Sequence, residues 1–150
     1  MIIRNLRIDN FRGIKKLNWS IPADKKLICI IGAGDSGKTT VLDALDWLLG
    51  DRWNLPISFS DYNDESKPIV ITALLTDLPD DLMTIDSCGL YLQGVSEDGK
   101  VVPEPFDGCE HCLVVELSIN IDFEPTWSII RSDGTLAAFK SSARRKLGVS

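Results

Sequence analysis

The sequence lacks any run of about 18 apolar residues, so it offers no candidate membrane-spanning helix. It also lacks internal repeats and low-complexity segments. The N-terminal stretch MIIRNLRIDNFRG carries a charge every few positions and has none of the apolar character of a signal peptide. Its 150 residues suffice for one domain that buries roughly 70% of its extended surface. We therefore expect a soluble, cytoplasmic protein without a membrane partner.

Basic residues are scarce in the middle of the chain. Residues 41–130 hold eighteen Asp and Glu against three Lys and Arg, a net charge of −15. Residues 1–40 hold eight Lys and Arg and three Asp, and residues 131–150 hold five Lys and Arg and one Asp. A strongly acidic segment repels a nucleic-acid backbone. We expect DNA contact only through a larger assembly, and we interpret most of these acidic side chains as solvated faces.

Cysteine and histidine are few, with four Cys and one His. Cys109, His111 and Cys112 form a C-x-x-C pair with a histidine inside it, and Cys88 could complete a Cys₃His zinc set. Only one such pair exists, and Cys88 is remote in sequence. Reduced thiols are ordinary in a cytosolic protein, and Cys29 lies in an apolar run typical of the core. We therefore expect these cysteines to carry no metal.

One glycine-rich stretch, IIGAGDSGKTT at residues 30–40, stands out. From Gly32 to Thr39 it fits G-x-x-x-x-G-K-[ST], the P-loop pattern. Glycines allow the backbone to approach and wrap a phosphate, while the lysine reaches the outer phosphates and the threonine hydroxyl binds Mg²⁺. We expect ATP and Mg²⁺ as cofactors, Thr39 as the Mg²⁺ ligand, and as ATP-binding residues Gly32, Gly34, Asp35, Ser36, Gly37, Lys38, Thr39 and Thr40.

The context of this motif supports the interpretation. Residues 27–31 form an unbroken apolar run, typical of a strand buried on both faces. A helix is predicted after the loop, with its N-terminus directed at the phosphates. Gly50 is predicted to stop this helix as its C-cap glycine. Asp43 and Asp46 lie off its apolar face, which comprises Val41, Ala44, Leu45, Leu48 and Leu49.

The rest of the chain is predicted to be mainly β. Alternating apolar residues indicate half-buried strands at 2–8 and 17–21, separated by a turn at 10–13, and further strands are expected at 69–75, 113–119 and 127–131. A polar loop spans 51–68, a short helix or turn follows at 79–81, a turn lies at 132–134, and a basic helix could start at 141–147. We expect an α/β fold in which residues 1–50 carry strands, P-loop and helix. Residues 69–131 form an antiparallel β subdomain, and 132–150 form a basic C-terminal segment.

Three segments carry a family resemblance. Residues 6–14 (LRIDNFRGI), 35–45 (DSGKTTVLDAL) and 56–62 (PISFSDY) resemble the N-terminal head of RecF/SMC-type ATPases, and most of all the OLD family. The resemblance covers residues 1–65. It implies a partial ABC/RecF-like P-loop ATPase head associated with DNA repair or phage defence. It also implies that Arg12 lies near the nucleotide and that Lys38 and Thr39 bind it. Such P-loops usually carry Asn where this chain has Gly34, so one side-chain contact to the nucleotide is expected to be lost.

Other parts of such ATPases are missing from the sequence. It has no Leu-Ser-Gly-Gly-like signature, and no Asp-x-Asp pair of the kind that forms a Toprim metal site. Asp77 and Glu116 each follow an apolar run in the manner of a Walker B carboxylate, but we interpret both as ordinary strand ends. The resemblance therefore implies that a second ATPase head, or a missing C-terminal half, completes the site. The chain itself could belong to a truncated reading frame, an expression fragment or a split protein.

The leading hypothesis is the ATP-binding segment of an OLD/RecF-like ATPase. The alternative is a non-catalytic nucleotide-binding or interaction module. A P-loop kinase is disfavoured because no lid-like Arg cluster follows the P-loop, and a GTPase because Asn-Lys-x-Asp is absent. We expect the isolated chain to bind Mg-ATP, to hydrolyse it at a negligible rate, and not to cleave DNA, because clustered carboxylates for that chemistry are missing.

Overall fold

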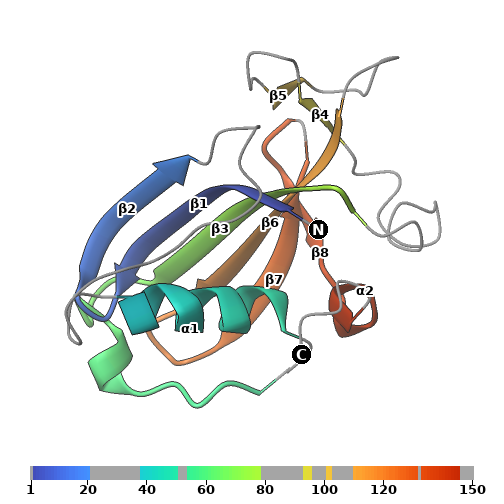
Figure 1. Cartoon of the computed structure of the whole chain (residues 1–150). Helices are drawn as coiled ribbons and strands as arrows, with labels where there is room; N and C mark the ends of the chain where they lie inside the picture. Colours follow the sequence, from blue (N-terminus) through green and yellow to red (C-terminus); the bar gives the residue numbers. More distant parts are fainter. Residues whose placement is uncertain are drawn as a thin grey trace.

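An antiparallel sheet dominates the molecule, and one long helix lies against one of its faces (Figure 1). The computed structural model describes residues 2–20, 38–50, 54–78, 93–95, 101–102, 110–131 and 133–145. The elements in chain order are β1 (Ile2–Phe11), β2 (Ile14–Ser20), α1 (Lys38–Leu49), the 3₁₀ helix η1 (Phe59–Asp61), β3 (Ile69–Thr76), β4 (Gln93–Val95), β5 (Val101–Val102), β6 (Glu110–Ile119), β7 (Pro125–Ile130), β8 (Leu136–Ala138) and α2 (Ser141–Arg145).

The sheet joins the N-terminal strands to the later ones. Its order is β2-β1-β3-β6-β4-β5, with β7 paired to β6 and β8 paired to β7. All of these pairs are antiparallel. The register sets Leu6 of β1 opposite Ala73 of β3, and Ala73 opposite Val115 of β6. The predicted antiparallel β unit after residue 68 is confirmed, and the structure adds β1 and β2 to the same sheet.

One face of the sheet forms the core. In β1, Leu6 and Ile8 are buried while Arg7 between them is exposed, because successive side chains of a strand point to opposite faces. The same alternation runs through β3 and β6, whose core residues are Ile69, Ile71, Ala73, Leu75, Leu113, Val115, Leu117 and Ile119. Helix α1 covers this face and packs its apolar residues into the same cluster. We refer to the opposite side of the sheet as its outer face.

The buried face of helix α1 is nearly the one that the sequence predicted. Val41, Ala44, Leu48 and Leu49 are buried, and Leu45 is partly buried against them. The structure adds Trp47, whose ring centroid lies 5.1 Å from that of Phe11 in β1. Each buried Leu or Val contributes roughly 1.5–3 kcal/mol relative to an exposed one, so the sheet holds the helix firmly.

The helix ends before Gly50, as predicted, but for a different reason. Among the described glycines only Gly134 has a positive φ, so the helix does not end in a left-handed cap residue at Gly50. Instead, the Gly50 N–H donates to the Asp46 carbonyl oxygen at 2.9 Å. A Cβ on Gly50 would lie 2.6 Å from that oxygen, so close approach of the backbone requires glycine here.

Side chains from β7 and α2 hold the C-terminal end of α1. Trp127 Nε1 donates to the Trp47 carbonyl oxygen at 3.0 Å. Arg144 Nε donates to the Gly50 carbonyl oxygen at 3.1 Å, and its Nη1 donates to the Phe139 carbonyl oxygen at 2.7 Å. The Arg144 guanidinium lies 4.0 Å from the Trp127 ring centroid. A cation is favourable at a helix C-terminus, where carbonyl groups carry partial negative charge.

Several boundaries differ from the sequence prediction. Strand β1 continues to Phe11, beyond the predicted end at Ile8, and β6 begins at Glu110. Strands β4, β5 and β8 were not predicted, because two or three residues are too few to show a period of two. Helix α2 confirms the predicted start of a basic helix. The predicted elements at 27–31 and 79–81 lie outside the described residues.

Candidate nucleotide-binding site

The glycine-rich loop itself lies outside the described residues, since Gly32, Gly34, Asp35, Ser36 and Gly37 are not among them. The helix predicted after it is confirmed, because α1 begins at Lys38. Thr39 is exposed and Thr40 is half-buried. The first N–H groups of a helix lack partners within the helix and carry partial positive charge. The start of α1 is therefore suited to an anion.

Arg12 comes to α1 from the turn between β1 and β2. Its φ is +53°, a left-handed conformation that is uncommon outside glycine. The turn is held by hydrogen bonds to η1 and to the segment that follows it. The Arg12 N–H donates to the Asp61 carbonyl oxygen at 2.7 Å, and Asn63 Nδ2 donates to the Arg12 carbonyl oxygen at 2.9 Å. These bonds offset the cost of the unusual backbone and direct the side chain over the helix.

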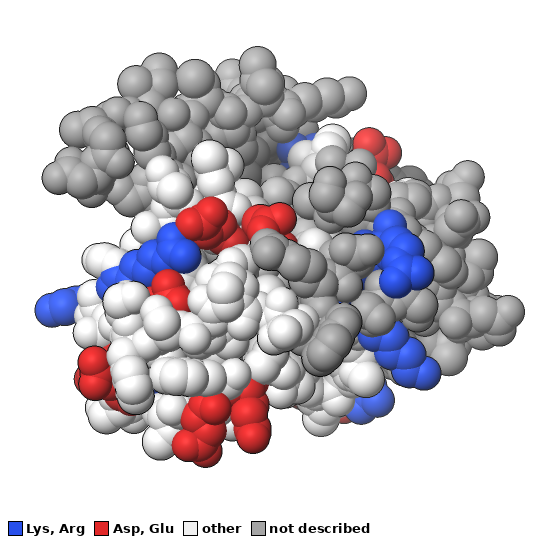
Figure 2. Space-filling model, turned by 90° about the horizontal axis from the view of Figure 1, so that it is seen from below, with Lys and Arg blue, Asp and Glu red and all other residues white. Residues whose placement is uncertain are grey.

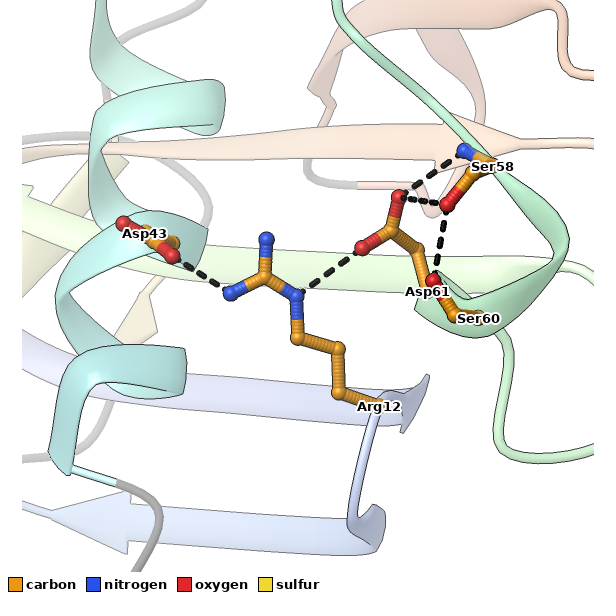
Figure 3. A network of polar contacts seen from close by, with 5 residues as sticks. All are labelled: Arg12, Asp43, Ser58, Ser60 and Asp61. Atoms are coloured by element: carbon orange, nitrogen blue, oxygen red, sulfur yellow. Dashed lines mark hydrogen bonds and ion pairs between the residues drawn. The ribbon is translucent and has the colours of Figure 1, made fainter. Parts of the chain in front are cut away.

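The Arg12 guanidinium bridges two carboxylates (Figure 3). Its Nε donates to Asp61 Oδ1 at 2.9 Å, and its Nη1 forms an ion pair with Asp43 Oδ2 of α1. The guanidinium also lies 4.8 Å from the Phe11 ring centroid and 5.6 Å from that of Trp47. The network thus connects the β1–β2 turn, α1 and η1 at one place.

Asp61 is the fixed part of this network. Its side chain is only 9% exposed, against 40% for Asp43. Besides Arg12, its carboxylate accepts the Ser58 N–H at 2.9 Å and the Ser58 hydroxyl at 3.3 Å. Ser58 Oγ in turn lies 2.8 Å from Ser60 Oγ. Asp61 therefore has several donors within the chain, whereas Asp43 faces solvent over much of its surface.

The electrostatics keep Arg12 charged. Burial disfavours the charged guanidinium, but hydrogen bonds to Asp43 and Asp61 outweigh it, and the net effect raises the pKa of Arg12. Asp43 follows Thr39 by four residues, which places the two on one side of α1, roughly 5–6 Å apart at their Cβ atoms. Arg12 therefore lies one helical turn from the residue that the sequence assigns to Mg²⁺.

We expect Asp61→Asn to lower the free energy of unfolding by about 2 kcal/mol. The variant loses a largely buried, charge-assisted hydrogen bond to Arg12 and a good acceptor for Ser58. Asp43→Asn is the matched control and should cost less than about 1 kcal/mol, because its pair with Arg12 is more exposed. Urea unfolding of the two variants measures the difference. Equal losses would contradict the assignment of Asp61 as the anchor.

The structure separates the two carboxylates that follow apolar runs. Asp77 directly follows β3 and is exposed, with a φ of +50°, which confirms that it lies at a strand end. The prediction for Glu116 was wrong, because Glu116 lies in the middle of β6, opposite Thr72 of β3 and Ser128 of β7. Its neighbours Val115 and Leu117 point into the core that α1 covers. Glu116 therefore lies on the outer face, away from α1.

The position of Glu116 predicts a pH effect on stability. Burial raises the pKa of Glu116, so the folded state favours the protonated form. The stability from this group is present below the ordinary Glu pKa and is lost as pH rises through the folded pKa. We expect Glu116→Gln to unfold at a higher urea concentration than wild type at pH 7, with a smaller gain at pH 4. Exposed Glu65→Gln is the control, and an equal gain at both pH values would contradict the prediction.

The zinc set that the sequence analysis weighed against metal-free cysteines can be inspected only at His111 and Cys112. The described residues hold no group of three or more His, Cys, Asp and Glu side chains suited to a metal. His111 is exposed and Cys112 is buried, and as neighbours in β6 they point to opposite faces. One ion could not bind both within a regular strand. Cys29, Cys88 and Cys109 lie outside the described residues.

Sequence reasoning missed Asp61 as a site residue, although a signal was present. Ser58 and Asp61 have the S-x-x-D spacing of a capping box, and the Ser58 N–H does donate to the Asp61 carboxylate. The pairing of Asp43 and Asp61 with Arg12 had no such local signal. These residues are 31 and 49 positions from Arg12.

The antiparallel sheet and the helix that begins at Lys38 agree with the fold of a P-loop ATPase, to which the comparisons below assign the chain. A family model described as the AAA ATPase domain matches residues 1–145. The chain therefore belongs to the AAA ATPase domain family. The part of the chain that the structure describes contains no helix long and apolar enough to cross a membrane.

Comparison with individual proteins agrees with this assignment. The chain is 30% identical over 114 residues to an OLD nuclease from Thermus scotoductus (strain ATCC 700910 / SA-01). The match covers 71% of the chain and 21% of the nuclease, so the chain spans about a fifth of the length of that relative.

Two solved structures share the fold. One comes from work on the ATP-driven dimerisation and DNA-stimulated activation of SMC ATPases. It has a TM-score of 0.57 and 17% identity, with 99% of this chain and 77% of that chain covered. The other is an SMC head bound to the C-terminal winged-helix domain of ScpA. It has a TM-score of 0.53 and 16% identity, with 99% of this chain and 39% of that chain covered.

The resemblance to SMC heads and OLD proteins inferred from residues 1–65 is confirmed, and the SMC-like fold extends over nearly the whole chain.

Proposed function

We propose that this chain is the Mg-ATP-binding segment of an OLD/SMC-like ATPase. In this proposal the backbone from Gly32 to Gly37 wraps the phosphates and Lys38 neutralises the outer ones. The Thr39 hydroxyl holds Mg²⁺, which would supply charge neutralisation at the phosphates. The sequence also assigns Asp35, Ser36 and Thr40 to this loop.

The observation that carries the proposal is the start of α1 at Lys38. In the P-loop pattern the helix must open directly after the glycine-rich loop, so that its unpartnered N–H groups face the phosphates. A chance match to the pattern has no reason to coincide with a helix start. Membership of the AAA ATPase domain family supports the same interpretation.

Arg12 is proposed to lie beside the nucleotide, where its guanidinium is a hydrogen-bond donor for a phosphate. Its ion pair with Asp43 lies one helical turn from Thr39. The Asp61 anchor keeps the guanidinium in place, so little conformational entropy is lost when a phosphate approaches. An exposed arginine on a flexible loop would lose more conformational entropy than Arg12 on binding a phosphate.

We further propose that turnover needs a partner, either a second ATPase head or the remainder of a longer chain. Hydrolysis requires groups that position water and stabilise the transition state, and we assign no described residue to these roles. Two observations support a partner: the match to the OLD nuclease covers only 21% of that relative, and one solved structure comes from work on ATP-driven dimerisation. A role in DNA repair or phage defence is proposed on the same resemblance.

The test is a titration of the purified chain with a fluorescent ATP analogue, with Mg²⁺ and with EDTA. We expect saturable binding with one nucleotide per chain, stronger with Mg²⁺, and competed by ATP and ADP. The absence of saturable binding in a chain that unfolds cooperatively would refute the proposal.

A further inference from the structure

Exposed hydrophobic side chains gather at the tip of the β6–β7 hairpin. Among the described residues, Phe59 of η1 is 62% exposed and Ile121 of the hairpin turn is 53% exposed. Phe123 joins the two elements, because its ring centroid lies 4.9 Å from that of Phe59 and 5.7 Å from that of Tyr62. The Tyr62 hydroxyl donates to the Asn120 carbonyl oxygen and fixes the contact. We call Phe59, Ile121 and Phe123 the hairpin-tip surface.

The backbone holds this surface in one conformation. Phe123 has a φ of +66°, which is unusual for a bulky side chain. The Asn120 side chain stabilises the turn by accepting the Asp122 N–H at 2.9 Å and the Glu124 N–H at 3.0 Å. The Phe123 N–H also donates to the Asn120 carbonyl oxygen at 3.2 Å. A surface already ordered before binding loses little entropy on docking.

The surroundings of the hairpin-tip surface are acidic. Residues 54–63 and 119–126 contain three carboxylates, of which the largely buried Asp61 is paired with Arg12. The exposed charges of these two segments are therefore those of Asp122 and Glu124. Asp122 and Glu124 are exposed on either side of Phe123. Burial is the main cause that raises the pKa of Tyr62; a backbone hydrogen bond at Phe123 lowers it, and the charges of Asp122 and Asp61 add smaller increases. Seen from below, acidic groups are spread over the surface, and basic groups lie both toward the side of α2 and on the opposite side (Figure 2).

We propose that the hairpin-tip surface docks a basic, apolar segment of another polypeptide. Exposed apolar groups favour a dry contact, and the acidic rim selects the occupant. It repels a nucleic-acid backbone and an anionic membrane. It also disfavours a second copy of the same surface, because a two-fold contact would bring like charges together. A segment with apolar side chains flanked by Lys or Arg satisfies both features.

The probe for this proposal is a synthetic amphipathic helical peptide made of Leu and Lys. A peptide with the same Leu pattern and Glu in place of Lys is its control. Fluorescence anisotropy of the labelled peptides at about 0.15 M salt, where charges farther apart than roughly 8 Å are screened, measures affinity for the whole chain. We expect the Lys peptide to bind and the Glu peptide to bind at least about tenfold more weakly.

Matched variants locate the contact. The double variant Phe59→Ser/Ile121→Ser should weaken binding of the Lys peptide by about tenfold or more, because two large apolar side chains leave the interface. Leu42→Ser/Leu136→Ser removes two hydrophobic residues of similar exposure, 56% and 52%, elsewhere on the molecule and should leave binding unchanged. Asp122→Lys should weaken binding several-fold, whereas Glu65→Lys, also exposed, should have a smaller effect.

Three results would overturn the proposal. One is equal weakening by the two double variants, and another is equal binding of the Lys and Glu peptides. The third is self-association of the wild type in sedimentation that Phe59→Ser/Ile121→Ser abolishes, since this would make a second copy the occupant. If a serine variant unfolds, Asp122→Lys decides the question, because no effect of that change would also refute the proposal.

Discussion

Lys38→Ala is expected to weaken Mg-ATP binding about tenfold to a hundredfold. A charge-assisted hydrogen bond is worth roughly 1.5–3 kcal/mol, and every 1.4 kcal/mol is about tenfold in affinity. Some binding should remain, because the N–H groups at the start of α1 and the loop backbone do not depend on the lysine side chain. The nucleotide titration described above measures the ratio of dissociation constants.

The matched control for this change is Lys16→Ala. Lys16 is exposed on β2, a strand at the edge of the sheet, and its removal alters the net charge by the same amount as Lys38→Ala. We expect Lys16→Ala to bind nucleotide like the wild type. A loss of affinity in both variants would assign the effect to overall charge, and unchanged affinity in Lys38→Ala would refute the phosphate role of Lys38.

Arg144→Ala is expected to lower the free energy of unfolding by about 3–5 kcal/mol. The side chain is almost fully buried, at 2% exposure. Its loss leaves the Gly50 and Phe139 carbonyl oxygens without their donor, and hydrogen bonds to charged groups are worth about 1.5–3 kcal/mol each. Stacking over Trp127 is lost as well, and a desolvated cation–π contact is worth about 2 kcal/mol. Non-additivity among these contacts keeps the total near 3–5 kcal/mol.

Arg145→Ala provides the comparison for this prediction. Arg145 is the next residue of α2 and is exposed, so its removal should change stability by no more than about 0.5 kcal/mol. Urea unfolding followed by tryptophan fluorescence reports on both variants, because Trp127 and Trp47 lie at the contact. Similar midpoints for the two variants would show that α2 does not anchor the end of α1.

Local patterns in the sequence were enough to predict most of the long elements. Strands β1, β3 and β6 show regular alternation or continuous apolar runs, and α1 shows an apolar stripe at helical spacing. These signals depend on residues that are only a few positions apart in the sequence. Glu116 shows where the approach failed. The strand predicted at 113–119 already included Glu116, so interpreting this carboxylate as a strand end conflicted with that prediction. Strand β6 continues through Glu116, which lies opposite Thr72 and Ser128.

Some residues of the candidate site could likewise be predicted from local sequence, and others could not. Lys38 and Thr39 were assigned from a motif of eight consecutive residues, and the start of α1 at Lys38 agrees with that motif. Arg12 entered through a family resemblance, without any indication of its partners. Its pairing with Asp43 and Asp61 depends on the β1–β2 turn, α1 and η1 meeting at one point. No periodicity connects residues so far apart in the chain.

The sequence by itself determined the P-loop pattern, the helix that follows it and the buried face of each long strand, because each of these depends on residues close together in the chain. Only the tertiary structure decided which strands share one sheet, how Trp127 and Arg144 hold the end of α1, and which carboxylates restrain Arg12. The same holds for the hairpin-tip surface, whose aromatic residues come from two elements about 60 positions apart. Contacts of this kind arise when the chain buries its apolar faces against one another, so they depend on the whole packing arrangement.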